Sequence, residues 1–478
     1  MTIVTYAPEL SPHHRLNEQL RLFAFQDEVP ADAEEEWRAL TRRERLAALL
    51  AGELDFHKED SSYASHDLHA FAAKFPPQLP RVFIRGLTNP GDIVLDPMMG
   101  SGTTVVEALL AGRRGIGLDL DPLAVRLGQV KTTPCDLARL RLAGERVIAQ
   151  AQRRLAEAQG VEDALATAFD ARTRQFIDYW FLPQTQRELM ALVLAIRSVD
   201  DLLARRFLEL TFSSIIITKS GGVARARDLA HSRPHLDIAK VPKSALEQFA
   251  ARLRKNLASM SHLRNDGPGA LTLAADARMI PLANSVVDLV VTSPPYANAI
   301  DYMRAHKFSL VWLNHSINDL SALRSEYIGA ERTTVASLPS TLVALPQRAE
   351  QILAELEQRD RARARVLRKY FCEMRSVLAE ILRVLRNDRA AIVVVGSSTM
   401  RTIDVQTHYC LADIAATLGF DVVGVARRAL DRNRRMMPAR FGRKSDSMIE
   451  QRMHEEYVIG LLKPFALRSG KSRANHRA

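Results

Sequence analysis

The stretch Ser293-Pro294-Pro295-Tyr296 places a hydroxyl group, two prolines and an aromatic ring directly after an apolar run. Proline has no N–H group and a fixed φ, and the residue before each proline is pushed toward an extended conformation. The loop is therefore stiff, and no following helical turn takes up its carbonyl groups. It presents hydrogen-bond acceptors beside an aromatic ring, although a plain turn that closes a strand would also account for these residues.

A glycine-containing loop, DPMMGSGTT (96–104), follows another apolar run. Gly100 and Gly102 let the backbone turn sharply and approach a ligand without interference from a Cβ atom. The loop is not a P-loop, because no Gly-Lys-Ser/Thr follows it. It also departs from the dinucleotide pattern G-x-G-x-x-G, because Val105 stands at the third small position. A purely structural turn is the alternative interpretation.

Acidic residues flank this loop. Asp96 precedes it, and Asp119 closes the next apolar run. A carboxylate in front of the loop repels a pyrophosphate but suits a ligand with positive charge or hydroxyl groups, and Asp119 stands where comparable folds bind an adenosine ribose. These features disfavour NAD and favour S-adenosylmethionine, which carries a sulfonium, an ammonium group and a ribose.

Strand and helix patterns alternate around these loops. A strand pattern over 93–95, a helix pattern over 103–111 and a second strand pattern over 115–118 predict half of an open, doubly wound sheet. Ligands of such sheets lie beyond the carboxyl ends of the strands. The predicted fold class is therefore α/β, with a mostly parallel Rossmann-like sheet. Further strands are predicted over 269–276, 286–291, 390–396, 421–427 and 456–463.

Changes in composition divide the chain into segments. We expect an N-terminal helical extension, a discontinuous catalytic domain, an inserted and largely helical region that is a candidate for target recognition, and a basic, disordered tail. In the same order, these segments are residues 1–60, 61–134 with 269–465, 135–268 and 466–478.

The bulk composition restricts the class of partner. Lysine and arginine number 66 against 55 acidic residues, which gives a net charge of +11 and favours a polyanionic partner. The three cysteines are far apart, so neither a disulfide framework nor a cysteine zinc site is expected. No signal segment and no apolar run long enough to span a bilayer is found, so we expect a soluble, cytoplasmic protein without a metal.

Four motifs together resemble the amino-methyltransferases that modify DNA bases: AKFPPQLPRVFIRGL, DPMMGSGTT, GIGLDLD and TSPPY. The resemblance covers roughly residues 66–130 and 270–312, with agreement at the level of strands to about residue 463. It implies a doubly wound methyltransferase fold and S-adenosylmethionine as the cofactor. TSPPY is the form most typical of cytosine-N4 enzymes, whereas adenine-N6 members more often carry an acid or Asn in place of the serine.

The implied chemistry accounts for the proline loop. An exocyclic amine is a poor nucleophile because its lone pair is delocalised into the ring, and acceptors of its N–H bonds concentrate electron density on the nitrogen. The resemblance assigns this role to the Ser293 hydroxyl and the Pro294 carbonyl, with Pro295 stiffening the loop. Tyr296 would stack on a base rotated out of the duplex. No covalent intermediate is required, and Cys135 is not expected to act as a nucleophile.

The resemblance also implies a set of cofactor-binding residues. Phe75 would form a wall at the methionine end, with core packing as the alternative, and Asp276 would contact the adenine amine, with a strand-end turn as the alternative. His66 and His69 are expected at the surface or behind the site. Asp301 and Tyr302 are candidates for the base pocket, with core packing as the alternative for Tyr302. The full cofactor-binding set is Phe75, Asp96, Pro97, Gly100, Ser101, Gly102, Thr103, Asp119 and Asp276.

Two basic stretches are candidates for DNA contacts. The motif order resembles that of the group whose target-recognition region lies between the two core motifs, which corresponds to 135–268 here. A second basic run, 426–444, lies between two predicted strands. The residues proposed to bind DNA are Lys219, Arg225, Arg227, Arg233, Arg432, Arg434, Arg435 and Arg440.

The sequence therefore predicts a site-specific methyltransferase that modifies the N4 amine of cytosine in double-stranded DNA, with the target base flipped. Its expected setting is restriction–modification or defence, with a cognate restriction endonuclease as a partner and a location at the nucleoid. The alternatives are an adenine-N6 DNA methyltransferase, an RNA amino-methyltransferase, and a DNA-binding subunit that has lost activity.

Overall fold

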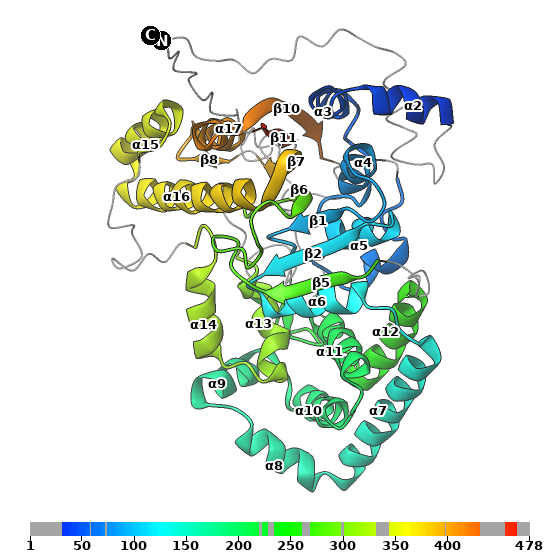
Figure 1. Ribbon diagram of the computed structural model, residues 1–478. Helices are drawn as coiled ribbons and strands as arrows, with labels where there is room; N and C mark the ends of the chain where they lie inside the picture. Colours follow the sequence, from blue (N-terminus) through cyan, green and yellow to red (C-terminus); the bar gives the residue numbers. More distant parts are fainter. Residues whose placement is uncertain are drawn as a thin grey trace, which may run out of the picture.

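A seven-stranded sheet forms the centre of the computed structural model, with strand order β10-β11-β7-β6-β1-β2-β5 (Figure 1). The structure describes residues 31–57, 59–71, 74–218, 222–227, 234–260, 268–297, 301–330, 344–396, 398–430 and 455–465. The strands are β1 (Ile93–Asp96), β2 (Arg114–Asp119), β5 (Ala270–Ala274), β6 (Val287–Thr292), β7 (Leu385–Gly396), β10 (Asp421–Ala429) and β11 (Glu455–Lys463).

The strand pairing defines where a ligand can bind. β1 runs parallel to β2 and β6, with Val94 opposite both Gly115 and Leu289. The chain moves from β1 to β2 and β5 on one side and then returns to β6 and β7 on the other, which makes the carboxyl ends of β1 and β6 the topological switch point. Only β11 runs against its neighbours. The predicted α/β class with a mostly parallel sheet is confirmed, and every predicted strand overlaps an observed one.

β7 begins five residues before its predicted start at residue 390. After Leu385 the strand continues with RNDR (386–389), which is polar and carries no strand pattern in the sequence. Asp288 on β6 explains the difference, because this fully buried carboxylate accepts hydrogen bonds from Arg386 Nη1 at 2.7 Å and Arg389 Nε at 3.2 Å. A buried charge is tolerated when it is paired in this way.

Helices cover both faces of the sheet (Figure 1). The alternating side chains of the strands divide between the two faces, as period-two patterning requires: Val94 and Val394 pack with one set of helices, and Leu95 and Val395 with the other. The first set is α2 (Ala31–Ala39), α3 (Arg42–Ala51), α4 (Gln78–Leu87) and α5 (Thr103–Leu110). The second set is α15 (Gln347–Arg359), α16 (Arg361–Val384) and α17 (Thr407–Leu418).

The N-terminal helices pack directly on the sheet. Trp37 is buried and donates its indole N–H to the carbonyl of Gly86 at 2.8 Å, and Leu46 and Leu49 share a core cluster with Val458 of β11. The apolar residues of this segment therefore complete the core of one sheet face.

A layer of helices lies beyond the β5 edge and forms its own core around Phe207, Leu253 and Trp312 (Figure 1). Its helices from residues 135–268 pack with the helix that follows β2 and with those that follow the proline loop. The members are α6 (Pro122–Thr132), α7 (Leu137–Glu157), α8 (Gln159–Thr167), α9 (Ala171–Trp180), α10 (Pro183–Arg197), α11 (Leu202–Ile216), α12 (Ala245–Met260), α13 (Met303–Leu310) and α14 (Ile317–Glu326). Short elements complete the fold: β3 (Ala226–Arg227), β4 (His235–Leu236), β8 (Thr399–Met400), β9 (Ile403–Asp404), η1 (Ala64–Asp67) and η2 (Val311–Leu313).

The buried carboxylate of Glu107 joins α5 to α4 and to the segment before α4. Its Oε1 accepts hydrogen bonds from Tyr63 Oη and His66 Nε2, both at 2.7 Å, and its Oε2 accepts one from Arg81 Nε at 2.7 Å. Burial alone would raise the pKa of Glu107, but His66 and Arg81 hold it below the usual value. Of the two predicted placements for His66 and His69, the surface is wrong, because both are buried and bonded, His69 through Nε2 to Ser213 Oγ at 2.9 Å. The other placement, behind the site, stays a prediction.

The described residues contain neither a membrane-spanning helix nor a cluster of metal-binding side chains. None of the helices in the described ranges is long and apolar enough to cross a bilayer. Among the same residues, no group of three or more His, Cys, Asp or Glu side chains is arranged to hold a metal ion.

Candidate active site

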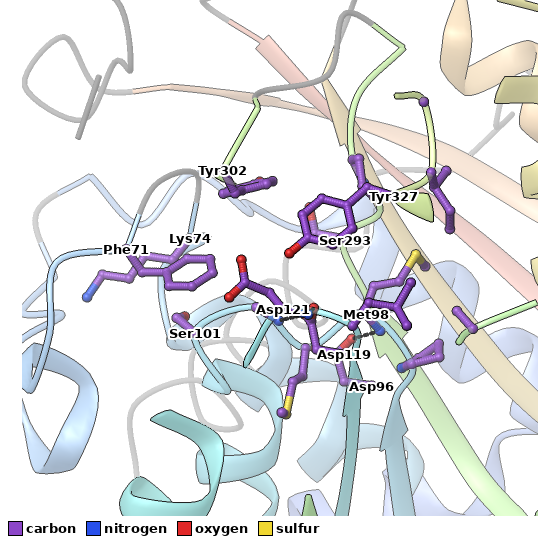
Figure 2. Close-up of a pocket in the computed structure, with 18 of the residues that line it drawn as sticks. Phe71, Lys74, Asp96, Met98, Ser101, Asp119, Asp121, Ser293, Tyr302 and Tyr327 are labelled. Carbon is purple, nitrogen blue, oxygen red and sulfur yellow. Dashed lines mark hydrogen bonds between the residues drawn. The ribbon is translucent and has the colours of Figure 1, made fainter. Parts of the chain in front are cut away.

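A pocket opens at the carboxyl ends of β1, β2 and β6, which is the switch point of the sheet (Figure 2). The glycine loop and the proline loop both reach it, although they lie about 190 residues apart in the chain. Of the residues proposed from the sequence, those that line the pocket are Phe75, Asp96, Pro97, Gly100, Ser101, Thr103, Asp119, Asp276, Ser293 and Pro295. Gly102, Pro294 and Tyr296 are not among the lining residues.

Asp96 connects the cofactor side of this pocket to the proline loop. It is buried at the end of β1, and its Oδ1 accepts hydrogen bonds from Thr292 Oγ1 at 2.7 Å and from the backbone N–H of Met98 at 3.2 Å. Burial raises its pKa to about 6. Since Ser293 follows Thr292 directly, this contact fixes the start of the proline loop relative to the glycine loop.

Asp119 closes β2 and holds the glycine loop from the other side. Its Oδ2 accepts from the backbone N–H of Gly100 at 2.8 Å, and its Oδ1 accepts from the backbone N–H of Asp121 at 2.9 Å. Burial, followed by the charge of Asp121, raises the pKa of Asp119 to about 7. A carboxylate in this position is poised to gain from ligand hydroxyl groups, because such donors favour its charged form.

The glycine loop requires glycine at two positions. Gly100 has φ +48° and Gly102 has φ +75°, which are left-handed conformations that other residues rarely adopt. A Cβ atom at Gly100 would also lie 3.1 Å from the ring of Phe71. The loop is further fixed by Lys131, whose fully buried Nζ donates to the carbonyl of Ser101 at 2.8 Å.

Lys131 was not singled out from the sequence. It lies within α6 and carries no motif, so only the folded structure shows that burial lowers its pKa and that its Nζ holds the glycine loop. The backbone carbonyl of Lys131 in turn accepts from Ser65 Oγ at 3.2 Å, which ties the segment before α4 to the same helix.

Aromatic residues form the wall opposite the acidic groups. Figure 2 shows Tyr302 and Tyr327 across the pocket from Asp119 and Asp121. The ring of Phe71 stacks on Tyr302 with centroids 5.6 Å apart. Sequence reasoning missed Phe71, Asp121 and Tyr327. Tyr302 lines the pocket, as one of its two predicted placements required.

Asp121 has a double role in the structure. Its Oδ1 accepts from the backbone N–H of Leu123 at 2.8 Å and caps α6, while its Oδ2 contacts His306 Nδ1 at 2.6 Å. Burial opposes the charged form, but His306 and the helix cap hold the pKa of Asp121 below its usual value. Asp121 is therefore ionised at neutral pH and lies next to the more easily protonated Asp119.

The proline loop places Ser293 at the pocket and Tyr296 behind it. The Tyr296 hydroxyl donates to Glu456 Oε1 of β11 at 2.6 Å, and its ring lies where a Cβ atom at Gly396 would be 2.6 Å away. Glu456 in turn pairs with the buried Arg428 of β10. Stacking of Tyr296 on a flipped base stays a prediction.

Asp276 lines the pocket as an ion-paired carboxylate. Arg278 donates from Nε to Asp276 Oδ1 at 2.9 Å and from Nη2 to Oδ2 at 2.7 Å, and its Nη1 contacts Glu373 at 2.9 Å. Burial opposes this charge, but Arg278 holds the pKa of Asp276 below its usual value. A ligand amine would therefore meet an ionised acceptor.

The residues proposed to bind DNA are only partly described. Arg225 donates from Nη2 to the carbonyl of Tyr179 at 2.8 Å, and Arg227 forms an ion pair with Asp237 at 2.7 Å. Both have partners within the protein, and neither lines the pocket. Six others lie outside the described residues: Lys219, Arg233, Arg432, Arg434, Arg435 and Arg440.

The raised pKa of Asp119 predicts that cofactor affinity depends on pH. With a pKa of about 7 in the free protein, Asp119 is partly protonated at neutral pH and becomes a full acceptor as the pH rises. Affinity for S-adenosylmethionine should therefore increase from pH 6 to pH 8 in the wild type, and this increase should be smaller in Asp119→Asn. Calorimetric titration across this range measures it, and a flat wild-type profile would contradict the assignment.

The same pKa has an opposite consequence for stability. Because the folded-state pKa lies above the unfolded value of about 3.9, the folded protein binds more protons between the two values. Asp119 therefore contributes stability at low pH that is lost as the pH rises toward 7. Cofactor binding and folding should thus respond to pH in opposite directions through this one carboxyl group.

The residues of the pocket fit S-adenosylmethionine. The ionised carboxylates suit the sulfonium and ammonium charges and the ribose hydroxyls, while Met98 and Ile328 supply apolar surface for an aromatic base. Lys74 lines the same pocket and suits a carboxylate. The glycine loop is not followed by the Gly-Lys-Ser/Thr with which a P-loop binds phosphate. The residues of the pocket therefore agree with a cationic cofactor.

Comparisons with known proteins agree with this chemistry. Residues 35–130 match the N6/N4 methyltransferase family model described as DNA methylase. The type II methyltransferase M.MvaI of Kocuria varians is 24% identical over 390 residues, which cover 76% of this chain and 83% of that protein. The type II methyltransferase M.MjaII of Methanocaldococcus jannaschii is 38% identical over 92 residues, which cover 19% of this chain and 17% of that protein.

Among solved structures, a SAM-dependent methyltransferase from Methanosarcina mazei is 10% identical and aligns with 80% of this chain and 98% of its own, with a TM-score of 0.30. A TM-score this low supports no conclusion about this protein. The fold, the acidic pocket and the family match over residues 35–130 are together typical of DNA amino-methyltransferases that use S-adenosylmethionine. Within that class, the matching relatives are type II methyltransferases.

Proposed function

We propose that the protein transfers a methyl group from S-adenosylmethionine to the N4 amine of cytosine in double-stranded DNA. The observation that carries this proposal is the convergence of Ser293 with Asp96 and Asp119 in one pocket at the switch point of the sheet. The type II relatives support restriction–modification as the setting, with a cognate endonuclease as the expected partner.

The chain supplies hydrogen-bond acceptors for the target amine and holds them in a fixed position relative to the cofactor loop. Ser293 Oγ and the Pro294 carbonyl accept hydrogen bonds from the target amine, which raises electron density on its nitrogen. When bound, S-adenosylmethionine supplies an electrophilic methyl group. The contact from Thr292 to Asp96 links the acceptor loop to the cofactor loop, so the two reactants are held in a fixed relation, which favours reaction by orientation.

The target base must leave the DNA duplex to reach this pocket. Ser293 lies at the carboxyl end of β6 and faces a concave site rather than a flat surface. A base within the stack cannot enter such a site, so the proposed reaction requires base flipping. Phe71 and Tyr302 provide an aromatic wall on which an extruded base can stack.

Cytosine N4 is proposed because the acceptor loop carries serine. Adenine N6 is the second candidate, since the acceptor chemistry is shared between the two amines. An RNA substrate and an inactive DNA-binding subunit are further outcomes that the same assay can distinguish.

The test is transfer of a labelled methyl group from S-adenosylmethionine to unmethylated genomic DNA and, in parallel, to total RNA. The proposal predicts incorporation into DNA alone. Incorporation into RNA alone would overturn the choice of polymer. Cofactor binding by calorimetry without incorporation into either polymer would favour the inactive subunit.

A further inference from the structure

A second recess adjoins the active-site pocket and is lined by basic side chains. Arg172 comes from α9, Arg304 and Lys307 from α13, and Arg324 from α14. The two hollows share Asp301, Arg324 and Ala330 as lining residues. Arg172 lies in the inserted region 135–268, and none of the four is among the individual residues that the sequence proposes to bind DNA. We call these four side chains, with Asp301, the basic recess.

The lining of the basic recess contains one carboxylate, Asp301, and four positive side chains, two of which it contacts. Asp301 Oδ2 accepts from Arg304 Nε at 2.8 Å and from Arg324 Nη2 at 2.6 Å. Asp301 thus neutralises one of the four charges and separates the recess from the active-site pocket. Its Oδ1 is buried and has no hydrogen-bond partner among the described residues.

The other two basic groups contact neutral partners. Arg172 Nη1 donates to the amide oxygen of Asn318 at 2.7 Å, and Lys307 Nζ lies 5.1 Å from the centroid of the Phe176 ring. Neither contact cancels charge. Burial lowers the pKa of Lys307, and Arg324, Arg304 and Arg172 lower it further, whereas Asp301 raises it. The lining of the basic recess therefore carries an excess of positive charge.

We propose that the basic recess binds a backbone phosphate of the DNA strand that carries the flipped nucleotide. Guanidinium and ammonium groups that converge on one hollow match the charge and the acceptor geometry of a phosphodiester. Phosphate contacts of this kind position DNA without reading its sequence. The inference rests on the proposed function, because it places the recess beside the pocket that receives the target base.

The test uses two substitutions that leave Asp301 paired. Arg172→Gln and Lys307→Gln remove charge, singly and together, while Arg304 and Arg324 keep their contacts with Asp301. Lys307→Arg retains the charge. Arg361→Gln and Arg365→Gln are matched controls, because both residues are exposed on α16, outside 135–268, and line neither the recess nor the active-site pocket. Fluorescence anisotropy then gives the affinity of each full-length variant for a duplex pool of random sequence over a series of salt concentrations.

The double variant is expected to bind the duplex about tenfold more weakly near 0.1 M salt, with a log–log salt slope shallower by about 1. Lys307→Arg and both control variants should match the wild type, and calorimetry should show unchanged affinity for S-adenosylmethionine. The inference is overturned by an unchanged affinity and slope in the double variant or by equal losses in the controls.

Methyl incorporation by the wild type separates this inference from the proposed function. If the wild type methylates DNA and the double variant binds DNA normally, the basic recess does not bind DNA, but the proposed function still holds. Weakened binding by the double variant, with no methylation by any form of the protein, would support the recess and reject the function.

Discussion

Replacement of Ser293 by alanine is expected to slow methyl transfer to DNA by roughly 10²–10³-fold, the usual cost of removing one preorganised hydrogen-bonding group that acts on the reacting atoms. Ser293 lines the active-site pocket and directly follows Thr292, which binds Asp96. The substitution removes only a hydroxyl group from a loop stiffened by prolines. Affinity for S-adenosylmethionine should therefore stay within about threefold of the wild type, and the loss should appear in kcat.

Two measurements check this result: initial rates of labelled methyl transfer at saturating cofactor and DNA, and calorimetric titration with S-adenosylmethionine. Ser376→Ala on α16 is the matched control, because Ser376 is exposed and its hydroxyl, among the described residues, bonds only to the carbonyl of Cys372 in its own helix. An activity of Ser293→Ala equal to that of the control would contradict the assigned role of the proline loop.

Replacement of Glu456 by alanine is expected to lower the free energy of unfolding by about 3–5 kcal/mol, because it breaks a buried ion pair and strands one charge. Arg428 is 3% exposed, and its guanidinium contacts Glu456 and the backbone carbonyl of Leu54. The same substitution removes the acceptor of the Tyr296 hydroxyl. Methyl transfer should therefore also fall at temperatures where the protein is still folded.

A neighbouring residue on β11 offers the control for this prediction. Glu455 pairs with Arg427 at 2.9 Å, but the two side chains are 35% and 69% exposed. An exposed pair of this kind contributes at most about 1 kcal/mol. Urea denaturation of Glu456→Ala and Glu455→Ala, side by side, measures the difference. Equal stability of the two variants would contradict the prediction that the buried pair of Arg428 and Glu456 stabilises the fold more than the exposed pair.

Local patterns were sufficient to predict the framework of the site. Apolar runs such as 93–95 and 286–291 mark buried strands, and the breakers after them place Asp96 and Ser293 at strand ends. Parallel strands at a switch point then bring these ends together, which is a consequence of topology rather than of any one motif. The predicted lining by Asp119 follows from the same rule, whereas the lining by Phe75 and Asp276 was predicted from the family resemblance.

Contacts between distant segments were not predictable from the same patterns. Glu107 meets His66 across 41 positions, and Tyr296 meets Glu456 across 160 positions. A buried charge leaves no periodic signal, because its burial depends on a partner that only the folded chain supplies. Lys131 shows the same limit: nothing in its helix distinguishes it from a solvated lysine, yet its Nζ fixes the glycine loop.

The basic recess illustrates this limit at the level of a site. Its residues lie between positions 172 and 324, on three helices that contain no dense basic run. The sequence instead drew attention to the basic stretches around Arg225 and Arg432. Within the described part of those stretches, Arg225 and Arg227 have partners inside the protein. Charge density along a chain is therefore a weak guide to charge density in space.

Mass spectrometry of nucleosides tests the central claim most directly. Purified protein is incubated with S-adenosylmethionine and unmethylated genomic DNA, with Ser293→Ala in parallel, and the DNA is digested to nucleosides. The account predicts N4-methylcytosine from the wild type and none above background from Ser293→Ala. N6-methyladenine would contradict the choice of base, and the absence of any methylated nucleoside despite cofactor binding would contradict the proposed activity.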